Sequence, residues 1–123
     1  MCVDLQGRTS LVTGAARGIG KEMAKELLEN KSNLILVDID EDKLKETETE
    51  LKNDQVKIGA YKLDISNFLA VQNFYQDVKT EFESVDILVN NAGITRDKLL
   101  MRMSEDDWDK VIAVNLKGAF NMV

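Results

Sequence analysis

The chain has 123 residues, of which 44% are apolar and 31% charged, a balance typical of one globular domain. The formal net charge of −6 argues against a non-specific nucleic-acid surface, and no apolar run approaches the ~18 residues of a membrane span. Cys2 is the only cysteine and histidine is absent, so we predict neither an internal disulfide nor a metal site. The N-terminus lacks a basic start and a long apolar stretch, so we expect a cytoplasmic protein without a secretory signal.

The hydrophobic pattern alternates between strand-like and helix-like segments along the chain. Short apolar runs predict four strands, at 9–13, 33–38, 56–63 and 85–91. Helical spacing predicts the segments between them, at 19–28, at 41–53 behind an Asp40 cap, and at 67–83, with a last helix opening at Ser104. The sequence therefore predicts a parallel α/β sheet with right-handed crossovers, in a single domain spanning residues 1–123.

The loop between the first strand and the first helix, TGAARGIG (13–20), is rich in glycine. Gly14 permits a tight turn, Gly18 lets the backbone approach a phosphate, and Gly20 lets the helix pack close to the strand. The unpaired amides at the start of the helix would then face an anion. A plain glycine-rich turn is the alternative, but a strand before the loop and a helix after it favour a dinucleotide site.

Asp38 ends the second predicted strand, where its carboxylate can accept hydrogen bonds from the ribose hydroxyls of an adenosine. The alternative is a polar strand terminus with no ligand. Repulsion between Asp38 and a 2′-phosphate favours NAD, whereas Arg17 could pair with that phosphate and favours NADP. No basic residue directly follows Asp38, so we predict NAD as the cofactor, with NADP as the alternative.

Taken together, these motifs resemble those of the short-chain dehydrogenase/reductase family. Three matches carry the resemblance: Thr13-Gly14-x-x-x-Gly18-Ile19-Gly20 with the cofactor loop, Asp64-Ile65 with the acidic–aliphatic pair that flanks adenine, and Asn90-Asn91-Ala92-Gly93 with the motif that ends strand four. The segment NNAGITRDKLLMRMSEDDWDKVIAVNLKGAF (90–120) resembles, more narrowly, the 3-oxoacyl-[acyl-carrier-protein] reductases.

The resemblance implies the first half of a doubly wound parallel sheet, the Rossmann fold, with strand order 3-2-1-4. It implies an NAD(P)-dependent oxidoreductase that reduces a ketone to a secondary alcohol, with a 3-oxoacyl-[acyl-carrier-protein] of fatty-acid synthesis as the favoured substrate. A homo-oligomer, specifically a tetramer, is implied as well. The implied cofactor contacts are Thr13, Gly14, Arg17, Gly18, Ile19, Gly20, Asp38, Ile39, Asp64, Ile65, Asn91, Ala92 and Gly93.

Asn115 is a polar residue in the apolar stripe of the last predicted helix. An unmet buried amide costs ~1–3 kcal/mol, so the side chain is expected either to have a packing partner or to serve a function. The resemblance implies the second: family members use an asparagine here to hold a water in the proton relay to the catalytic lysine.

The string YQDVK (75–79) matches the Tyr-x-x-x-Lys pair that the family uses as its proton donor. In the family, however, that pair follows the Asn-Asn-Ala-Gly motif and a catalytic serine. Tyr75 precedes the motif and shares a helix stripe with Phe74, Val78 and Phe82. We therefore predict that Tyr75 is a core residue.

The resemblance implies that the family's catalytic serine, tyrosine and lysine would lie beyond Val123. We therefore expect the 123 residues to be the N-terminal portion of a longer reductase, ending before the catalytic strand and helix. A non-catalytic half-domain that binds a dinucleotide or a partner strand is the alternative. Acetoacetyl-CoA, sugars and steroids are the alternative substrates, because reductases of these compounds share the same first half.

Overall fold

The computed structural model describes residues 4–92 together with 105, 106, 109 and 122. Its elements, in chain order, are β1 (Thr9–Thr13), α1 (Gly18–Glu29), β2 (Asn33–Asp38), α2 (Glu41–Leu51), β3 (Ile58–Lys62), α3 (Phe68–Glu81) and β4 (Ile87–Val89). The predicted alternation of strand and helix is confirmed over these residues. The third and fourth strands are shorter than the apolar runs that predicted them, and α2 ends at Leu51 rather than near Asn53.

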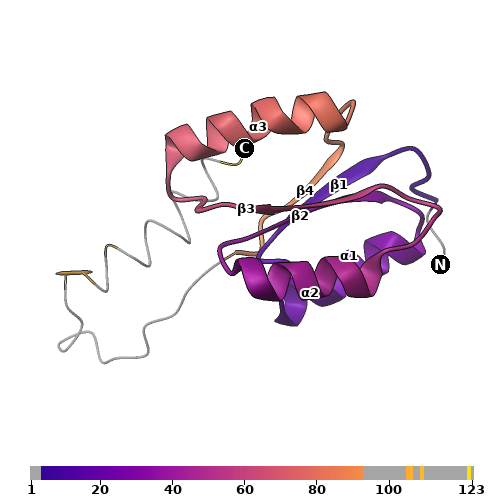
Figure 1. The fold of residues 1–123 in the computed structure, drawn as a ribbon, viewed down its shortest axis with the longest axis horizontal. Helices are drawn as coiled ribbons and strands as arrows, with labels where there is room; N and C mark the ends of the chain where they lie inside the picture. Colours follow the sequence, from indigo (N-terminus) through magenta and orange to yellow (C-terminus); the bar gives the residue numbers. More distant parts are fainter. Residues whose placement is uncertain (1–3, 93–104, 107–108, 110–121, 123) are drawn as a thin grey trace.

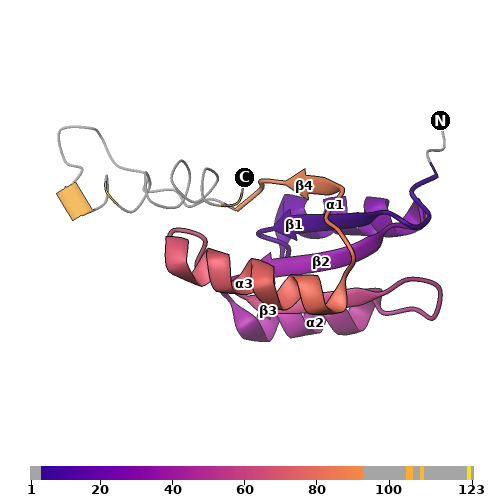
Figure 2. The same ribbon diagram turned by 90° about the horizontal axis from the view of Figure 1, so that it is seen from above.

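The four strands form one parallel sheet in the order β3-β2-β1-β4 (Figure 2), which confirms the predicted order. Strand β1 lies in the interior of the sheet and pairs with β2 on one side and β4 on the other; Leu11, for example, lies between Ile35 and Leu88. All five residues of β1 are buried, as expected for a strand covered on both faces.

The helices cover both faces of the sheet, with α3 on one face and α1 and α2 on the other (Figure 1). Because successive strand residues point to opposite faces, β2 contributes to two cores. Ile35 and Val37 belong to a cluster with Phe74 of α3, whereas Leu34 and Leu36 belong to a cluster with Ala24 of α1 and with Leu44 and Leu51 of α2. Burial of these side chains fixes the register that brings the carboxyl ends of the strands together.

Within the part of the chain that the structure describes, no helix combines the length and apolar character needed to cross a membrane. The same residues contain no cluster of three or more histidine, cysteine, aspartate or glutamate side chains placed to hold a metal ion.

Candidate functional site

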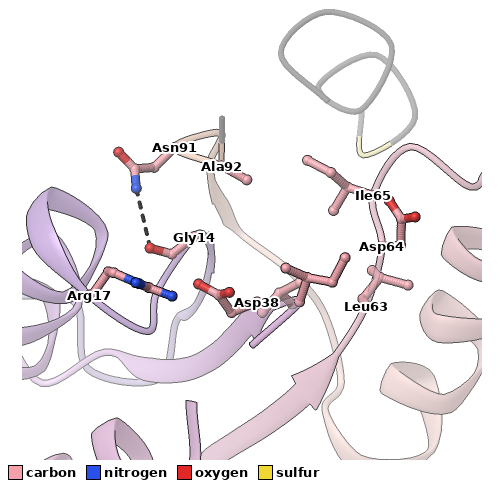
Figure 3. A pocket seen from close by; sticks show the side chains of 10 residues that line it. Gly14, Arg17, Asp38, Leu63, Asp64, Ile65, Asn91 and Ala92 are labelled. Atoms are coloured by element: carbon pink, nitrogen blue, oxygen red, sulfur yellow. Dashed lines mark hydrogen bonds between the residues drawn. The ribbon is translucent and has the colours of Figure 1, made fainter. Parts of the chain in front are cut away.

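A pocket of about 460 Å³ opens at the carboxyl ends of the strands, and its volume lies in the usual range for small-molecule sites. Eight predicted cofactor contacts line it, from four separate segments: Gly14, Arg17, Asp38, Ile39, Asp64, Ile65, Asn91 and Ala92. Figure 3 shows the glycine loop and Asp38 on one side of this pocket and residues 63–65 on the other. The structure therefore brings together motifs that lie up to 78 residues apart in the sequence.

Two glycines shape the turn between β1 and α1 by close approach. A Cβ on Gly20 would lie 2.1 Å from the carbonyl oxygen of Gly14, and a Cβ on Gly14 would lie 3.0 Å from the Cα of Ala92. The side-chain amide of Asn91 donates through Nδ2 to the same Gly14 carbonyl at 3.4 Å (Figure 3). These positions admit no side chain without displacing backbone, so the start of α1 sits directly against the loop and the end of β4.

Gly18 meets a different requirement. Its φ of +61° is a left-handed conformation that glycine adopts readily and β-branched residues rarely adopt. A Cβ built on it would meet no described protein atom within 4 Å, so the space beside it is open. Gly18 and the 69%-exposed Ile19 border a shallow depression along α1 rather than the main pocket. The first turn of α1 is thus accessible to a ligand.

The loop is held in place by contacts to both the backbone amide and the backbone carbonyl of Ala16. The amide of Ala16 donates to Asp38 Oδ2 at 3.1 Å, and its carbonyl accepts from Thr47 Oγ1 at 3.0 Å. Thr47 lies on α2 and is 1% exposed, so its hydroxyl donates to the loop within the protein interior. These two bonds orient the peptides immediately before the start of α1.

The charges near the loop form a short network. Besides Ala16, Asp38 accepts the amide of Asp40 through Oδ1 at 2.9 Å. Asp40 in turn accepts the amide of Lys43 at 3.1 Å, which caps α2 as predicted, and pairs with the Arg17 guanidinium at 2.8 Å. A carboxylate has about four acceptor sites, so the two backbone bonds leave Asp38 capacity for a ligand hydroxyl.

Residues 63–65 form the opposite wall of the pocket. Leu63 and Ile65 are buried with the α3 core, whereas Asp64 is exposed. Oδ1 of Asp64 accepts from both the amide and the hydroxyl of Ser66, at 3.0 and 2.6 Å, which stabilises the turn that leads to α3. An apolar side wall next to a polar turn suits the flat face and the polar edge of a heteroaromatic ring.

Thr13 does not line the pocket, although the sequence resemblance placed it among the cofactor contacts. Its side chain is fully buried, and its hydroxyl accepts from the amides of Asn91 and Ala92, both at 3.0 Å. It also donates to the Val89 carbonyl at 3.3 Å. Thr13 therefore positions the segment after β4 beside the glycine loop. Gly93 and Asn115, the remaining predicted residues, lie outside the described part of the chain.

Tyr75 is half-buried and packs against the α3-side core, in agreement with the prediction. Its ring centroid lies 5.3 Å from that of Phe74, and its hydroxyl donates to the Met122 carbonyl. Burial raises the pKa of Tyr75, which favours the neutral phenol, and Lys79 is exposed. An activating lysine would lower that pKa, so the string YQDVK has no property of a proton-donor pair here.

Three parts of the site could not be recognised from the sequence. Val37 and Leu63 line the pocket but read as ordinary strand residues, and the Thr47 contact joins residues 31 positions apart. The pairing of Arg17 with Asp40 gives a weak signal at most, because an acidic residue at a helix N-cap is already explained by capping.

The donor set fits an adenine dinucleotide. An open first turn at α1, Asp38 with spare acceptor capacity, and an apolar wall at 63–65 match the pyrophosphate, the ribose and the adenine, respectively.

Known proteins resemble this chain in both sequence and fold. The family model of the short chain dehydrogenases matches residues 8–123. The 3-oxoacyl-[acyl-carrier-protein] reductase FabG of Thermotoga maritima is 41% identical over 118 residues, which are 96% of this chain and 48% of that protein. The FabG of Staphylococcus epidermidis is 43% identical over 117 residues, 94% of this chain and 48% of that protein. The chain thus spans about half the length of these relatives.

Solved structures of short-chain dehydrogenases/reductases have the same fold as this chain. A short-chain dehydrogenase/reductase, described as glucose/ribitol dehydrogenase, from Brucella melitensis has a TM-score of 0.93 and 31% identity, covering 99% of this chain and 49% of its own. A short-chain dehydrogenase/reductase from Burkholderia phymatum, solved in complex with NAD, has a TM-score of 0.92 and 30% identity, covering 98% of this chain and 43% of its own.

Proposed function

The chain belongs to the short chain dehydrogenase family, and from this premise we propose that it is the NAD-binding portion of a longer cytoplasmic oxidoreductase. The observation that carries the proposal is that Gly14, Arg17 and Asp38 together form one wall of the pocket, at the carboxyl ends of β1 and β2. In open α/β sheets, dinucleotides bind at this edge.

Different residues of the site bind different parts of the dinucleotide. The amides at the start of α1 hold the pyrophosphate, and Gly18 leaves the space that the phosphates need. Asp38 accepts hydrogen bonds from the adenosine ribose, and Leu63 and Ile65 pack against the adenine. When bound, NAD supplies hydride-transfer chemistry; the described residues bind and orient it.

NAD is proposed over NADP because the pocket wall beside the expected ribose is acidic. Asp38 would repel a 2′-phosphate, and the structure adds that Arg17 is already paired with Asp40 at 2.8 Å. The Burkholderia phymatum relative was solved with NAD, which supports the same choice.

A ketone reduced to a secondary alcohol is the proposed reaction, with a 3-oxoacyl-[acyl-carrier-protein] as substrate. Support comes from the names of the Thermotoga maritima and Staphylococcus epidermidis relatives. By the same resemblance, Asn115 would hold a water of the proton relay, and the protein would work as a homo-oligomer, a tetramer.

Binding of both cofactors to the intact protein tests the proposal for the dinucleotide. Wild type should bind NAD more tightly than NADP, and Asp38→Ser should narrow that preference several-fold, since two unit charges about 4 Å apart interact by ~1 kcal/mol in water. Titration calorimetry gives both dissociation constants. A tenfold preference of wild type for NADP would show that Asp38 does not control the choice.

Turnover by the intact protein tests the proposal for the substrate. A panel of 3-oxoacyl thioesters, sugars and steroids, each with NADH and NADPH, should give the highest kcat/KM with a 3-oxoacyl thioester. Highest activity on a sugar or a steroid would redirect the substrate assignment. Cofactor binding with no turnover on any ketone would favour the non-catalytic half-domain instead.

A further inference from the structure

Asp40 makes two separate interactions through its two carboxylate oxygens. Oδ1 accepts the amide of Lys43 at 3.1 Å and so caps α2, while Oδ2 accepts from the Arg17 guanidinium at 2.8 Å. The backbone amide of Asp40 donates to Asp38 at 2.9 Å. Asp40 is thus fixed from both sides, and it presents a defined oxygen to Arg17.

Arg17 is the sole cation among the described residues that line the pocket. Its side chain is 69% exposed, whereas that of Asp40 is 33% exposed and is also bonded to the amide of Lys43, so the arginine is the less constrained member of the pair. An ion pair this exposed contributes little to folding stability. Its consequence lies instead in where the guanidinium is held, because Arg17 and Asp38 border the same pocket.

We propose that Asp40 is a specificity-determining residue that holds Arg17 away from the 2′ position of the adenosine and thereby excludes NADP. This inference rests on the proposed binding of a dinucleotide with its ribose at Asp38. Recruitment of Arg17 by a 2′-phosphate draws the guanidinium away from Asp40, so the free energy of the Arg17–Asp40 pair opposes NADP binding. NAD carries no phosphate there, and its binding leaves the pair intact.

The two roles of Asp40 can be separated by one substitution. Asparagine caps a helix as well as aspartate does, so Asp40→Asn keeps the bond to the Lys43 amide. The amide nitrogen that replaces Oδ2 is a donor without charge, and it cannot accept from the guanidinium. Asp40→Asn therefore frees Arg17 without removing the cap of α2.

The test measures the dissociation constants of NAD and NADP for four forms of the intact protein: wild type, Asp40→Asn, Arg17→Gln and the double variant. Asp40→Asn should tighten NADP binding about fivefold, an effect in the range of a single charged contact. NAD binding should change less than twofold. In the Arg17→Gln background, the gain for NADP should fall to less than about twofold, because no guanidinium is left to release.

Three results would overturn the inference. NADP affinity unchanged by Asp40→Asn would show that the pair does not restrain Arg17. An equal gain for both cofactors would point to a general change in the loop. A gain for NADP that persists in the Arg17→Gln background would assign the effect to the charge of Asp40 alone.

The same measurements separate this inference from the proposed function. If wild type binds neither cofactor, the proposed dinucleotide site is wrong, and the role of Asp40 falls with it. If wild type binds NAD and Asp40→Asn does not improve NADP binding, the site stands and the role of Asp40 alone is refuted. Circular dichroism and the unfolding midpoint should match wild type in all four forms.

Discussion

The helices α1 and α2 both begin at the carboxyl edge of the sheet, but their first turns are filled differently. The residue before α1 is Arg17, whose side chain makes no capping hydrogen bond, and the first turn contains no acidic residue. The residue before α2 is Asp40, which caps the Lys43 amide, and Glu41 and Asp42 follow it. Each helix starts with amide groups that need an acceptor, yet only α2 supplies one from its own sequence.

The difference separates a helix start that its own side chain caps from one whose amides stay open to a ligand. A carboxylate cap and acidic residues in the first turn complement the partial positive charge of α2 and would repel a further anion. The start of α1 keeps that partial charge uncompensated, behind a glycine with open space beside it. Leaving a cap out costs α1 stability, and phosphate binding would offset that cost.

Blocking the open end of α1 is expected to have the largest effect. Gly18→Val places a β-branched side chain at φ +61°, in the space that the phosphates would occupy, so NAD binding should be lost. No described atom lies within 4 Å of the new Cβ, so the fold should survive with ~1–2 kcal/mol of strain. Titration calorimetry and circular dichroism measure the two effects.

Gly18→Ala is the matched control, because it carries the same backbone strain and a smaller side chain. Its loss of stability should be similar, and its loss of affinity should be smaller than that of Gly18→Val. If Gly18→Val retains NAD affinity and has normal circular dichroism, the phosphates do not bind at this turn.

Releasing the loop from α2 is expected to have the next largest effect. Thr47→Val keeps the shape of the side chain but leaves the Ala16 carbonyl without its 3.0 Å donor. The free energy of unfolding should fall by ~1–3 kcal/mol, and NAD binding should weaken because the start of α1 is less well oriented. Urea unfolding and NAD titration measure these changes.

Two further variants serve as controls for Thr47→Val. Thr47→Ser retains the hydroxyl and should recover most of the NAD affinity even where packing is reduced. Thr49→Val changes an exposed threonine of the same helix and should alter stability by less than ~0.5 kcal/mol. Equal NAD affinity in Thr47→Val and wild type would limit Thr47 to a role in folding.

Closing the open end of α1 with a cap should have the smallest effect. Arg17→Ser supplies a hydroxyl where α2 has a carboxylate, and Arg17→Ala removes the same side chain without supplying one. The free energy of unfolding, measured by urea titration, should be ~1 kcal/mol higher for the serine variant than for the alanine variant. It should also bind NAD more weakly than the alanine variant, because its hydroxyl occupies an amide that the phosphates need. Tighter NAD binding by Arg17→Ser than by Arg17→Ala would contradict the trade between capping and binding.

Much of the fold could be predicted from local patterns in the sequence. The apolar run at 33–38 and the Asp40 cap gave β2 and the start of α2 correctly, since strand burial and capping each act over a few residues. The outer strands β3 and β4 were predicted too long. Val56 and Val85 continue the apolar runs, but neither has a ladder partner in the sheet.

The candidate site could be predicted where a motif fixes the backbone, as at Gly14 and Gly20, but not where side chains meet across the fold. The Thr47 hydroxyl reaches the Ala16 carbonyl because α2 packs beside the loop, and nothing in a helical threonine indicates that direction. Thr13 matched a motif correctly, yet its hydroxyl faces the segment after β4 rather than the pocket. Motifs locate such residues, and packing decides which way each one points.

An NAD titration of the intact protein, labelled with ¹⁵N and followed through its backbone amides, tests the contrast between the two helices most directly. The largest chemical-shift changes should fall on Gly14 and on the first turn of α1 at Gly18 and Ile19, with the amide of Lys43 in α2 almost unchanged. Changes centred on the first turn of α2, or no change at α1 at saturating NAD, would contradict the assignment of α1 as the anion-binding end.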